Sequence, residues 1–204
     1  MVHNQFKQSK GTHLDKLFHP DKSKKGDVDE LVKPLINLIN SDDNYFTTSS
    51  CSGRIMILVP SKVKQDVEWL FFSHEEVNAS ELIKKIHKFT NSSEKEIWFK
   101  IEGFILHVAC KDIESAQRLL NVAKSVGLKR SGIISTTSKV MVEIISSELL
   151  ETPISKNKNL MVEDNYLEFI IDEANAKLRR THKRIKKLEE ALNNLKLLVP
   201  KERF

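Results

Sequence analysis

The sequence predicts an α+β fold: a mixed, largely antiparallel sheet built from repeated strand-strand-helix units, followed by a long C-terminal helix. Two β-branched or aromatic runs precede each of two amphipathic helical segments, and a last pair of such runs follows them. Near Leu160 the pattern changes to apolar residues in steps of four and three. A doubly wound sheet of the Rossmann type would alternate single strands with helices, so the order of segments argues against it.

The N-terminal part is predicted to form two helices joined by a charged loop. Apolar residues at helical spacing favour a helix over residues 4–19, which Pro20 stops. Asp27 with Glu30 three residues later is typical of a helix start, and the apolar stripe that follows predicts a second helix that ends near residue 40. Between the helices, residues 21–26 contain three lysines and a glycine, which is typical of a solvated connection.

Residues 44–54, Asn-Tyr-Phe-Thr-Thr-Ser-Ser-Cys-Ser-Gly-Arg, are predicted to form a polar loop. Six hydroxyl or thiol side chains in a row suit a helix interior poorly, because short polar side chains bond the nearby backbone instead. Gly53 and Arg54 end the stretch. Such a loop offers hydroxyls, backbone N–H groups and one positive charge to a polar or anionic ligand.

Two helices and three pairs of strands are expected in the middle of the chain. Asn78 with Glu81 begins the first helix, Asp112 caps the second, and Gly127 ends it. The expected strands are residues 54–59, 67–72, 96–101, 104–110, 131–136 and 140–145, the first two as a hairpin.

The C-terminal part is predicted to be a separate element. Residues 1–151 form the expected core, residues 152–159 with Pro153 the linker, and residues 160–204 a basic amphipathic helix. From Lys177 to Lys187 there are seven lysines or arginines and no acid, which favours contact with a polyanion such as RNA over a merely solvated face. Whether this helix packs on its own core, pairs two chains as a homodimer or reaches RNA stays open.

Composition narrows the classes of protein. No apolar run approaches the roughly 20 residues of a membrane span, and the first ten residues lack the apolar segment of a secretory signal, so we expect a cytoplasmic protein without a membrane partner. Cys51 and Cys110 belong to no C-x-x-C pair, so neither a disulfide framework nor a metal site is expected. The dinucleotide-binding G-x-G-x-x-G, the nucleotide-cradling lysine motif and the G-x-S-x-G elbow are absent from the sequence.

Two histidines are candidates for acid-base chemistry. One interpretation is a nucleophile with a histidine base: Ser49 or Cys51 would attack, and His74 or His107 would take the proton. A serine-rich segment is, however, more often a ligand cradle or a turn. His107 lies within an apolar run, where a core role is the alternative. His74 directly follows such a run, where functional groups often gather.

Five segments stand out in order: Asp21-x-Ser23-x-Lys25-Gly26, Tyr45 to Arg54, Trp69 to His74, Leu106-His107-Val108 with Cys110, and Ser131-Gly132-Ile133. Taken together, they resemble the tRNA wybutosine-synthesising protein 3 family over about residues 3–150. Thr47 stands where the family's hydroxyl-rich segment more often begins with serine, which preserves the hydroxyl. The resemblance implies an S-adenosylmethionine-dependent methyltransferase, with a fold unlike the usual methyltransferase sheet. Its implied substrate is a ring nitrogen, N4, of the tricyclic wyosine-type guanosine derivative next to the anticodon of phenylalanine tRNA.

The resemblance also implies roles for these residues. Methyl transfer to a ring nitrogen needs close in-line approach and removal of the nitrogen's proton. Asp21 is the first candidate base, with His74 and His107 as alternatives. The expected cofactor-binding residues are Ser49, Ser50, Cys51, Gly53, Arg54, Ser131 and Gly132.

The expected tRNA contacts come from the charged loop and the C-terminal helix. Their binding should weaken steeply with salt, as phosphate contacts do. The alternative to an enzyme is a non-catalytic RNA-binding protein that uses the same basic residues. Those residues are Lys22, Lys24, Lys25, Lys177, Arg179, Arg180, Lys183 and Arg184.

Overall fold

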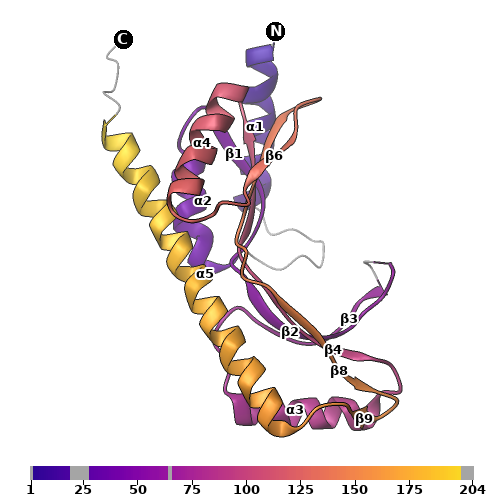
Figure 1. Ribbon diagram of the computed structural model, residues 1–204. Coiled ribbons are helices and arrows are strands. Elements are labelled where there is room, and N and C mark those ends of the chain that lie inside the picture. Colours follow the sequence, from indigo (N-terminus) through magenta and orange to yellow (C-terminus); the bar gives the residue numbers. More distant parts are fainter. Residues whose placement is uncertain (1, 19–27, 64–65, 199–204) are drawn as a thin grey trace. The chain divides into compact units, whose positions relative to one another are not determined.

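The computed structural model describes residues 2–18, 28–63 and 66–198 and has an α+β fold with antiparallel sheets (Figure 1). The predicted fold class is confirmed, since strand pairs alternate with helices and a long C-terminal helix follows. The helices are α1 (Val2–Phe18), α2 (Lys33–Asn40), α3 (Ala79–Ser92), α4 (Ile113–Ser125) and α5 (Asp164–Leu198), with a 3-10 helix η1 (Glu30–Val32) before α2. The strands are β1 (Tyr45–Cys51), β2 (Arg54–Val59), β3 (Glu68–Ser73), β4 (Ile97–Glu102), β5 (Ile105–Cys110), β6 (Gly132–Ser135), β7 (Val140–Ile145), β8 (Leu150–Lys156) and β9 (Asn159–Leu160).

The strands form two sheets, where one was expected. A four-stranded sheet has the order β1-β5-β7-β6, and a five-stranded sheet has the order β3-β2-β4-β8-β9. All of their pairings are antiparallel. β1 runs into β2 through Ser52-Gly53, β4 into β5 through Gly103-Phe104, and β7 into β8 through residues 146–149. Three extended segments therefore supply neighbouring strands to both sheets.

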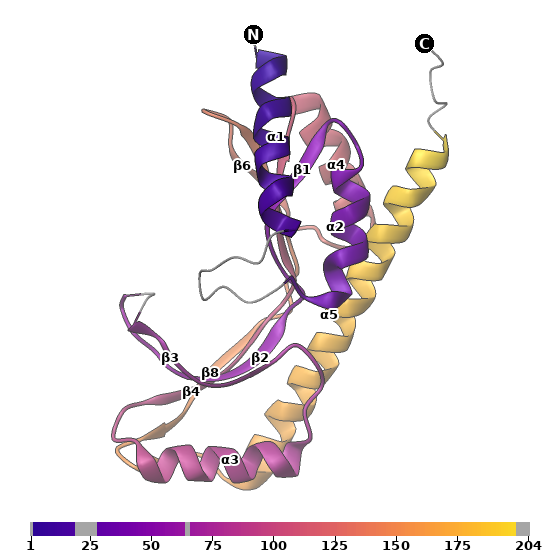
Figure 2. The same ribbon diagram turned by 180° about the vertical axis from the view of Figure 1, so that it is seen from behind.

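Each sheet belongs to its own compact unit. The first unit consists of residues 1–52, 104–147 and 182–204, and the second of residues 53–103 and 148–181. α5 is one continuous helix that contributes its C-terminal half to the first unit and its N-terminal half to the second (Figure 2). No helix in the described ranges is both long and apolar enough to cross a membrane.

One face of the first unit's sheet is covered by α2, α4 and the C-terminal half of α5. Alternate residues of β5 and β7 face these helices, because side chains alternate across a strand. Leu106 and Val108 of β5, opposite Ile144 and Val142 of β7, are fully buried there. The helices fill this core with Leu35, Ile36, Ile39, Ala116, Leu119, Leu120, Ala123, Ile185 and Leu188.

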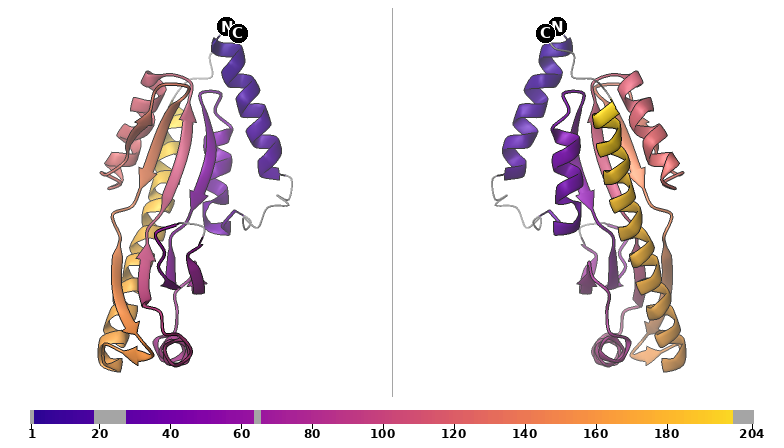
Figure 3. Two further views of the ribbon diagram at one scale, coloured as in Figure 1. Left: turned by 90° about the vertical axis from the view of Figure 1, so that its right-hand side faces the viewer. Right: turned by 90° about the vertical axis from the view of Figure 1, so that its left-hand side faces the viewer.

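The opposite face of the same sheet is covered in part by α1. The ring of Phe6 lies 5.2 Å from the ring of Phe46 on β1, and the ring of His13 lies 5.0 Å from it. Figure 3 shows α1 beside β1 and α4 towards the opposite edge of the sheet. Since Phe46 pairs with Ala109, this second face also carries His107, two residues earlier on β5.

The second unit buries one face of its sheet against α3 and the N-terminal half of α5. Ile55 and Ile57 of β2 and Phe99 and Ile101 of β4 are fully buried in this core. Asn78 caps α3 by accepting the backbone N–H of Glu81, as predicted. From α5, the core takes Leu167, Ile170, Ile171, Ala174 and Leu178.

The apolar stripe of α5 is buried within its own chain in both units, which addresses the open question about this helix. Leu178 and Leu188 are each 0% exposed. Pairing two chains through this stripe, or swinging the helix towards RNA, would require exposing those side chains to water. The units therefore differ from the predicted division into a core and a separate C-terminal helix.

Two predicted irregular segments are strands. The predicted polar loop at residues 44–54 contains β1, because its backbone bonds β5 instead of its own hydroxyls and because Phe46 is buried. The predicted linker at residues 152–159 contains most of β8 and part of β9. Pro153 is tolerated there because β9 pairs only with Ser155 and Lys156, which leaves β8 as an edge strand at the proline.

Candidate active site

Three polar side chains form a hydrogen-bonded row across neighbouring strands of the first unit. Ser49 Oγ on β1 lies 2.7 Å from Nδ1 of His107 on β5, and His107 Nε2 lies 3.0 Å from Oε2 of Glu143 on β7. Ser49 is exposed, and His107 and Glu143 keep 27% and 29% of their side-chain surface exposed. The row is therefore accessible on the sheet face opposite α2 and α4.

Strand register builds this row. His107 pairs with Glu143 across β5 and β7 and with Ser49 across β5 and β1. A β-bulge between Thr47 and Ser49 shifts the register of β1, so that Ser49 rather than Thr48 stands opposite His107. The hydroxyl of Thr48 instead lies 3.4 Å from the carbonyl oxygen of His107.

The row fixes the orientation of an imidazole for proton transfer. In the His107 tautomer that donates its Nε2–H to the Glu143 carboxylate, Nδ1 carries no proton and can accept from the Ser49 hydroxyl. His107 can then take up a proton at Nδ1 while Glu143 stabilises the imidazolium that forms. This arrangement suits a general base that acts directly or through Ser49.

Glu143 was absent from the predicted site residues. The alternation of β7 carries part of the signal, because Val142 and Ile144 face the core and Glu143 must face the other side. Its pairing with His107 depends on which strands are neighbours, and the sequence pattern did not show that.

The residues after Ser49 point to alternate sides of β1. Cys51 pairs with Ile105 and shares the face of His107, whereas Ser50 pairs with Leu106 on the helix-covered side. The structure thus brings Ser49 and Cys51 to one face and places Ser50 on the other.

Asp29 is a further residue that the sequence analysis missed. Both the backbone N–H and the hydroxyl of buried Ser52 donate to Asp29 Oδ2, at 2.7 and 2.9 Å. Asp29 precedes η1, so this carboxylate ties the start of η1 and α2 to the end of the hydroxyl-rich strand.

Ser131 and Gly132 have different settings. The buried Ser131 hydroxyl accepts the backbone N–H of Ile145 at 3.1 Å and so supports the sheet. Gly132 pairs with Glu143 across β6 and β7, and no atom lies within 4 Å of the point where a side chain would begin. The glycine leaves the sheet face open beside Glu143.

Arg54 and His74 lie in the second unit. His74 Nδ1 lies 2.8 Å from the carbonyl oxygen of Gly53, to which it donates. Arg54 Nη2 lies 3.1 Å from Glu102 Oε2, and the guanidinium carbon lies 4.3 Å from the centre of the Trp69 ring. The guanidinium is thus held by one carboxylate and one indole.

Gly53 is required by the backbone where β1 runs into β2. Its φ is +98°, in a region that side-chain-bearing residues rarely adopt. A Cβ at this position would lie 3.1 Å from the carbonyl oxygen of Glu102 and 3.2 Å from Thr181 Cγ2. The predicted ligand-binding glycine therefore has a structural role that is visible in the second unit.

Two pKa shifts bear on the candidate residues. Burial would raise the pKa of Glu102, but the hydrogen bond and charge of Lys100 and the charge of Arg54 outweigh it and hold this pKa below its ordinary value of 4.5. Burial, with the nearby charge of Asp112, raises the pKa of the Cys110 thiol to about 12. Cys110 therefore stays protonated and packs as an apolar residue instead of acting as a nucleophile.

The predicted RNA-contacting residues of α5 have protein partners in the second unit. Lys177 Nζ and Arg180 Nη2 lie 3.8 and 3.1 Å from Oε2 of Glu148, a buried residue. Arg179 pairs with Glu76. These cations stabilise the second unit in the structure as it stands.

The other residues that were predicted to contact RNA lie outside the second unit. In the first unit, Lys183 is exposed and Arg184 Nη1 lies 3.5 Å from the Ser146 hydroxyl. The first-choice base Asp21 and the loop lysines Lys22, Lys24 and Lys25 lie outside the described residues.

Comparison with known proteins finds relatives along most of the chain. The family model described as methyltransferase TYW3 matches residues 8–194. A zebrafish (Danio rerio) protein named tRNA wybutosine-synthesizing protein 3 homolog is 38% identical over 92% of this chain and 74% of its own. A Pyrococcus furiosus protein named tRNA(Phe) 7-((3-amino-3-carboxypropyl)-4-demethylwyosine(37)-N(4))-methyltransferase 1 is 41% identical over 84% of this chain and 88% of its own.

Solved structures are also similar to this chain. The PH1069 protein from Pyrococcus horikoshii matches with a TM-score of 0.84 and 37% identity, over 95% of this chain and 99% of that one. The fold and these matches together define a methyltransferase that lacks a doubly wound sheet. Specifically, the chain belongs to the methyltransferase TYW3 family.

Proposed function

We propose that this protein transfers a methyl group from S-adenosylmethionine to N4 of the tricyclic guanosine derivative next to the anticodon of tRNA(Phe), the reaction for which its archaeal relative is named. The observation that carries the proposal is the row Ser49–His107–Glu143. A ring nitrogen that bears a proton must lose it as the new bond forms, and the row orients an imidazole that can accept this proton at Nδ1.

In this proposal the three residues divide the work. His107 removes the proton of N4 at Nδ1, either directly or through the Ser49 hydroxyl. Glu143 keeps the opposite nitrogen protonated and stabilises the positive charge that His107 gains. Asp21 and His74 stay alternatives for the same step.

The donor set on this face suits the proposed cofactor. S-adenosylmethionine supplies an electrophilic methyl group when it is bound. Thr48 and Ser49 present exposed hydroxyls that can bond its sugar or amino-acid groups, and Cys51 lies on the same face. The missing side chain at Gly132 leaves room for a ligand beside Glu143.

Arg54 in the second unit is the proposed partner of a carboxylate or a phosphate. Its Nε is buried and has no hydrogen-bond partner among the described residues. A buried donor without an acceptor costs free energy, and an anionic ligand group would satisfy it.

The proposed substrate is a tRNA, so we place the protein in the cytoplasm. We expect Lys183 and Arg184, with loop lysines 22, 24 and 25, to contact the RNA backbone.

The most direct test of the reaction uses purified protein, labelled S-adenosylmethionine and tRNA(Phe) that carries the unmethylated tricyclic base. Mass spectrometry should find one added methyl group on that base. tRNA(Phe) with unmodified guanosine is the matched control and should gain none.

The expected result separates an enzyme from a non-catalytic RNA-binding protein. In the proposal, S-adenosylmethionine alone also raises the melting temperature, because a ligand that binds only the folded state stabilises it. Binding of tRNA without cofactor binding or methyl transfer would contradict the proposed function.

A further inference from the structure

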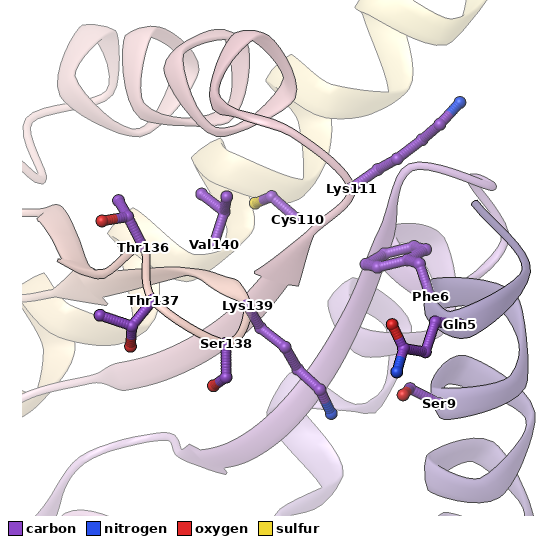
Figure 4. A pocket seen from close by; sticks show the side chains of 10 residues that line it. All are labelled: Gln5, Phe6, Ser9, Cys110, Lys111, Thr136, Thr137, Ser138, Lys139 and Val140. Carbon is purple, nitrogen blue, oxygen red and sulfur yellow. The ribbon is translucent and has the colours of Figure 1, made fainter. Parts of the chain in front are cut away.

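An open pocket of about 420 Å³ lies at one end of the first unit's sheet (Figure 4). Its walls come from α1, from the end of β5 and from the turn between β6 and β7. Cys110, Val140 and Phe6 form its apolar part. Its polar lining consists of Gln5, Ser9, Lys111, Thr136, Thr137, Ser138 and Lys139.

The charge of this lining is entirely positive. Two lysines, four hydroxyls and one amide line the pocket, and none of the ten lining residues is acidic. Within the described part of the chain, no carboxylate lies within ion-pair distance of Lys111 or Lys139, and the ammonium of Lys139 lies 5.5 Å from the centre of the Phe46 ring. Ammonium, hydroxyl and amide donors beside an apolar wall favour the binding of an anion.

The pocket lies at the end of the strands that carry the Ser49–His107–Glu143 row, although Cys110 belongs to the helix-covered face. Cys110 pairs with Val140 three positions along the same β5–β7 ladder in which His107 pairs with Glu143. Three strand residues span about 10 Å. Lys139 and Phe6 contact Phe46, and Phe46 lies on the face that carries His107, so this part of the pocket lies on the side of the row.

We propose that this pocket binds backbone phosphates of the RNA strand next to the nucleotide that the row modifies. The inference rests on the proposed function, because it takes the row as the place of the target base. At about 10 Å from the row, the pocket is within reach of phosphates one or two nucleotides along the strand.

The geometry favours a chain of phosphates over one small anion. In Figure 4 the Lys139 side chain extends towards Gln5 and Ser9 of α1, whereas Lys111 extends away from them. Two divergent cations contact successive phosphates more readily than they enclose a single one. The hydroxyls of Thr137 and Ser138 lie in the turn and add neutral donors.

The test compares Lys111→Ala/Lys139→Ala with Lys124→Ala/Lys129→Ala, which removes the same charge from exposed positions of the first unit outside the pocket. The probe is a fluorescent anticodon stem-loop of tRNA(Phe), titrated by anisotropy at several salt concentrations without cofactor. The pocket variant should bind about 20- to 60-fold more weakly near 0.1 M salt, with the salt slope smaller by about 1.4–1.8, as two lost phosphate contacts imply. The control variant should keep the wild-type slope.

Equal losses in both variants would overturn the proposal, because they would show a diffuse basic surface. Equally, unchanged RNA binding together with weaker binding of inorganic phosphate by the pocket variant would show a site for free anions. Far-UV circular dichroism of both variants checks folding, and Lys111→Arg/Lys139→Arg should restore binding. RNA binding is measured without methyl transfer, so a failure of the proposed reaction would appear separately, as no methylation by the wild-type protein.

Discussion

The basic side chains of the two units differ in whether a carboxylate is already within ion-pair distance. In the second unit, the α5 cations Lys177 and Arg180 pair with Glu148, and Arg179 pairs with Glu76. The open face of the first unit's sheet instead presents the row, and its neighbouring lysines 111 and 139 have no described carboxylate within ion-pair distance.

This difference separates charges that hold the fold from charges that are available to a ligand. A cation whose carboxylate is already in contact gains little from a phosphate unless the first pair breaks. Two basic surfaces that look alike in the sequence therefore have different expected roles, and substitutions can test the distinction.

Among the charged residues of the two units, the largest effect is expected for Glu143→Gln in the first unit. The amide can no longer stabilise an imidazolium at His107, so the methyl-transfer rate should fall by about 10²-fold or more. The melting temperature should change little, since the side chain is 29% exposed. A variant that loses stability but keeps its rate would place Glu143 among the fold-holding charges.

The next effect is expected for Glu148→Gln in the second unit, where the loss should fall on stability. Loss of this buried carboxylate leaves Lys177 and Arg180 without their shared partner and should lower the free energy of unfolding by about 1–3 kcal/mol. Glu76→Gln breaks only the exposed pair with Arg179 and should cost less than about 1 kcal/mol. Urea denaturation measures both, and equal costs would contradict the assignment.

Gly53→Ala tests the backbone at the end of the hydroxyl-rich segment. The positive φ and the 3.1 Å approach to Glu102 predict a loss of about 1–3 kcal/mol. Gly11→Ala within α1 is the matched control, with no atom within 4 Å, and should stabilise the protein by about 0.5–1 kcal/mol. Similar melting temperatures for the two variants would show that Gly53 is not constrained by the backbone.

The smallest effect is expected for Glu102→Gln, as a change in pH dependence. The pKa of Glu102 is lower in the folded chain than its ordinary value of 4.5, so its stabilising contribution is full above that value and is lost as pH falls through the lower folded pKa. The melting temperature of the variant should therefore fall less steeply than that of the wild type as pH drops from about 5 to 3. Parallel curves would show that Glu102 does not contribute to acid sensitivity.

The sequence predicted the elements of this fold better than their assembly. Asp112 and Gly127 delimit α4 as expected, because caps depend on local hydrogen bonds: the Ser115 N–H donates to Asp112, and the Leu128 N–H donates to the Ala123 carbonyl. The split into two sheets could not be read locally, because it depends on which extended runs join end to end.

The sequence predicted only part of the candidate site, again because strand pairing could not be read from it. Ser49 and His107 carry polar chemistry in otherwise apolar or hydroxyl-rich strands, and that pattern is visible in the sequence. Glu143 and the bulge after Thr47 complete the row, and both are properties of strand pairing. Arg54 was recognised as a charge at the end of a motif, but its partner Glu102 lies on a strand whose neighbour the sequence did not reveal.

The central claim is that His107, aligned by Glu143, removes the proton of the methylated nitrogen. The most direct test is the single-turnover methylation rate of His107→Ala at saturating cofactor and tRNA, beside His87→Ala, which removes an imidazole that also contacts a carboxylate, 2.8 Å from Asp164, in the second unit. We predict a rate about 10²- to 10⁴-fold below wild type for His107→Ala and a wild-type rate for His87→Ala. A wild-type rate in both variants would contradict the claim.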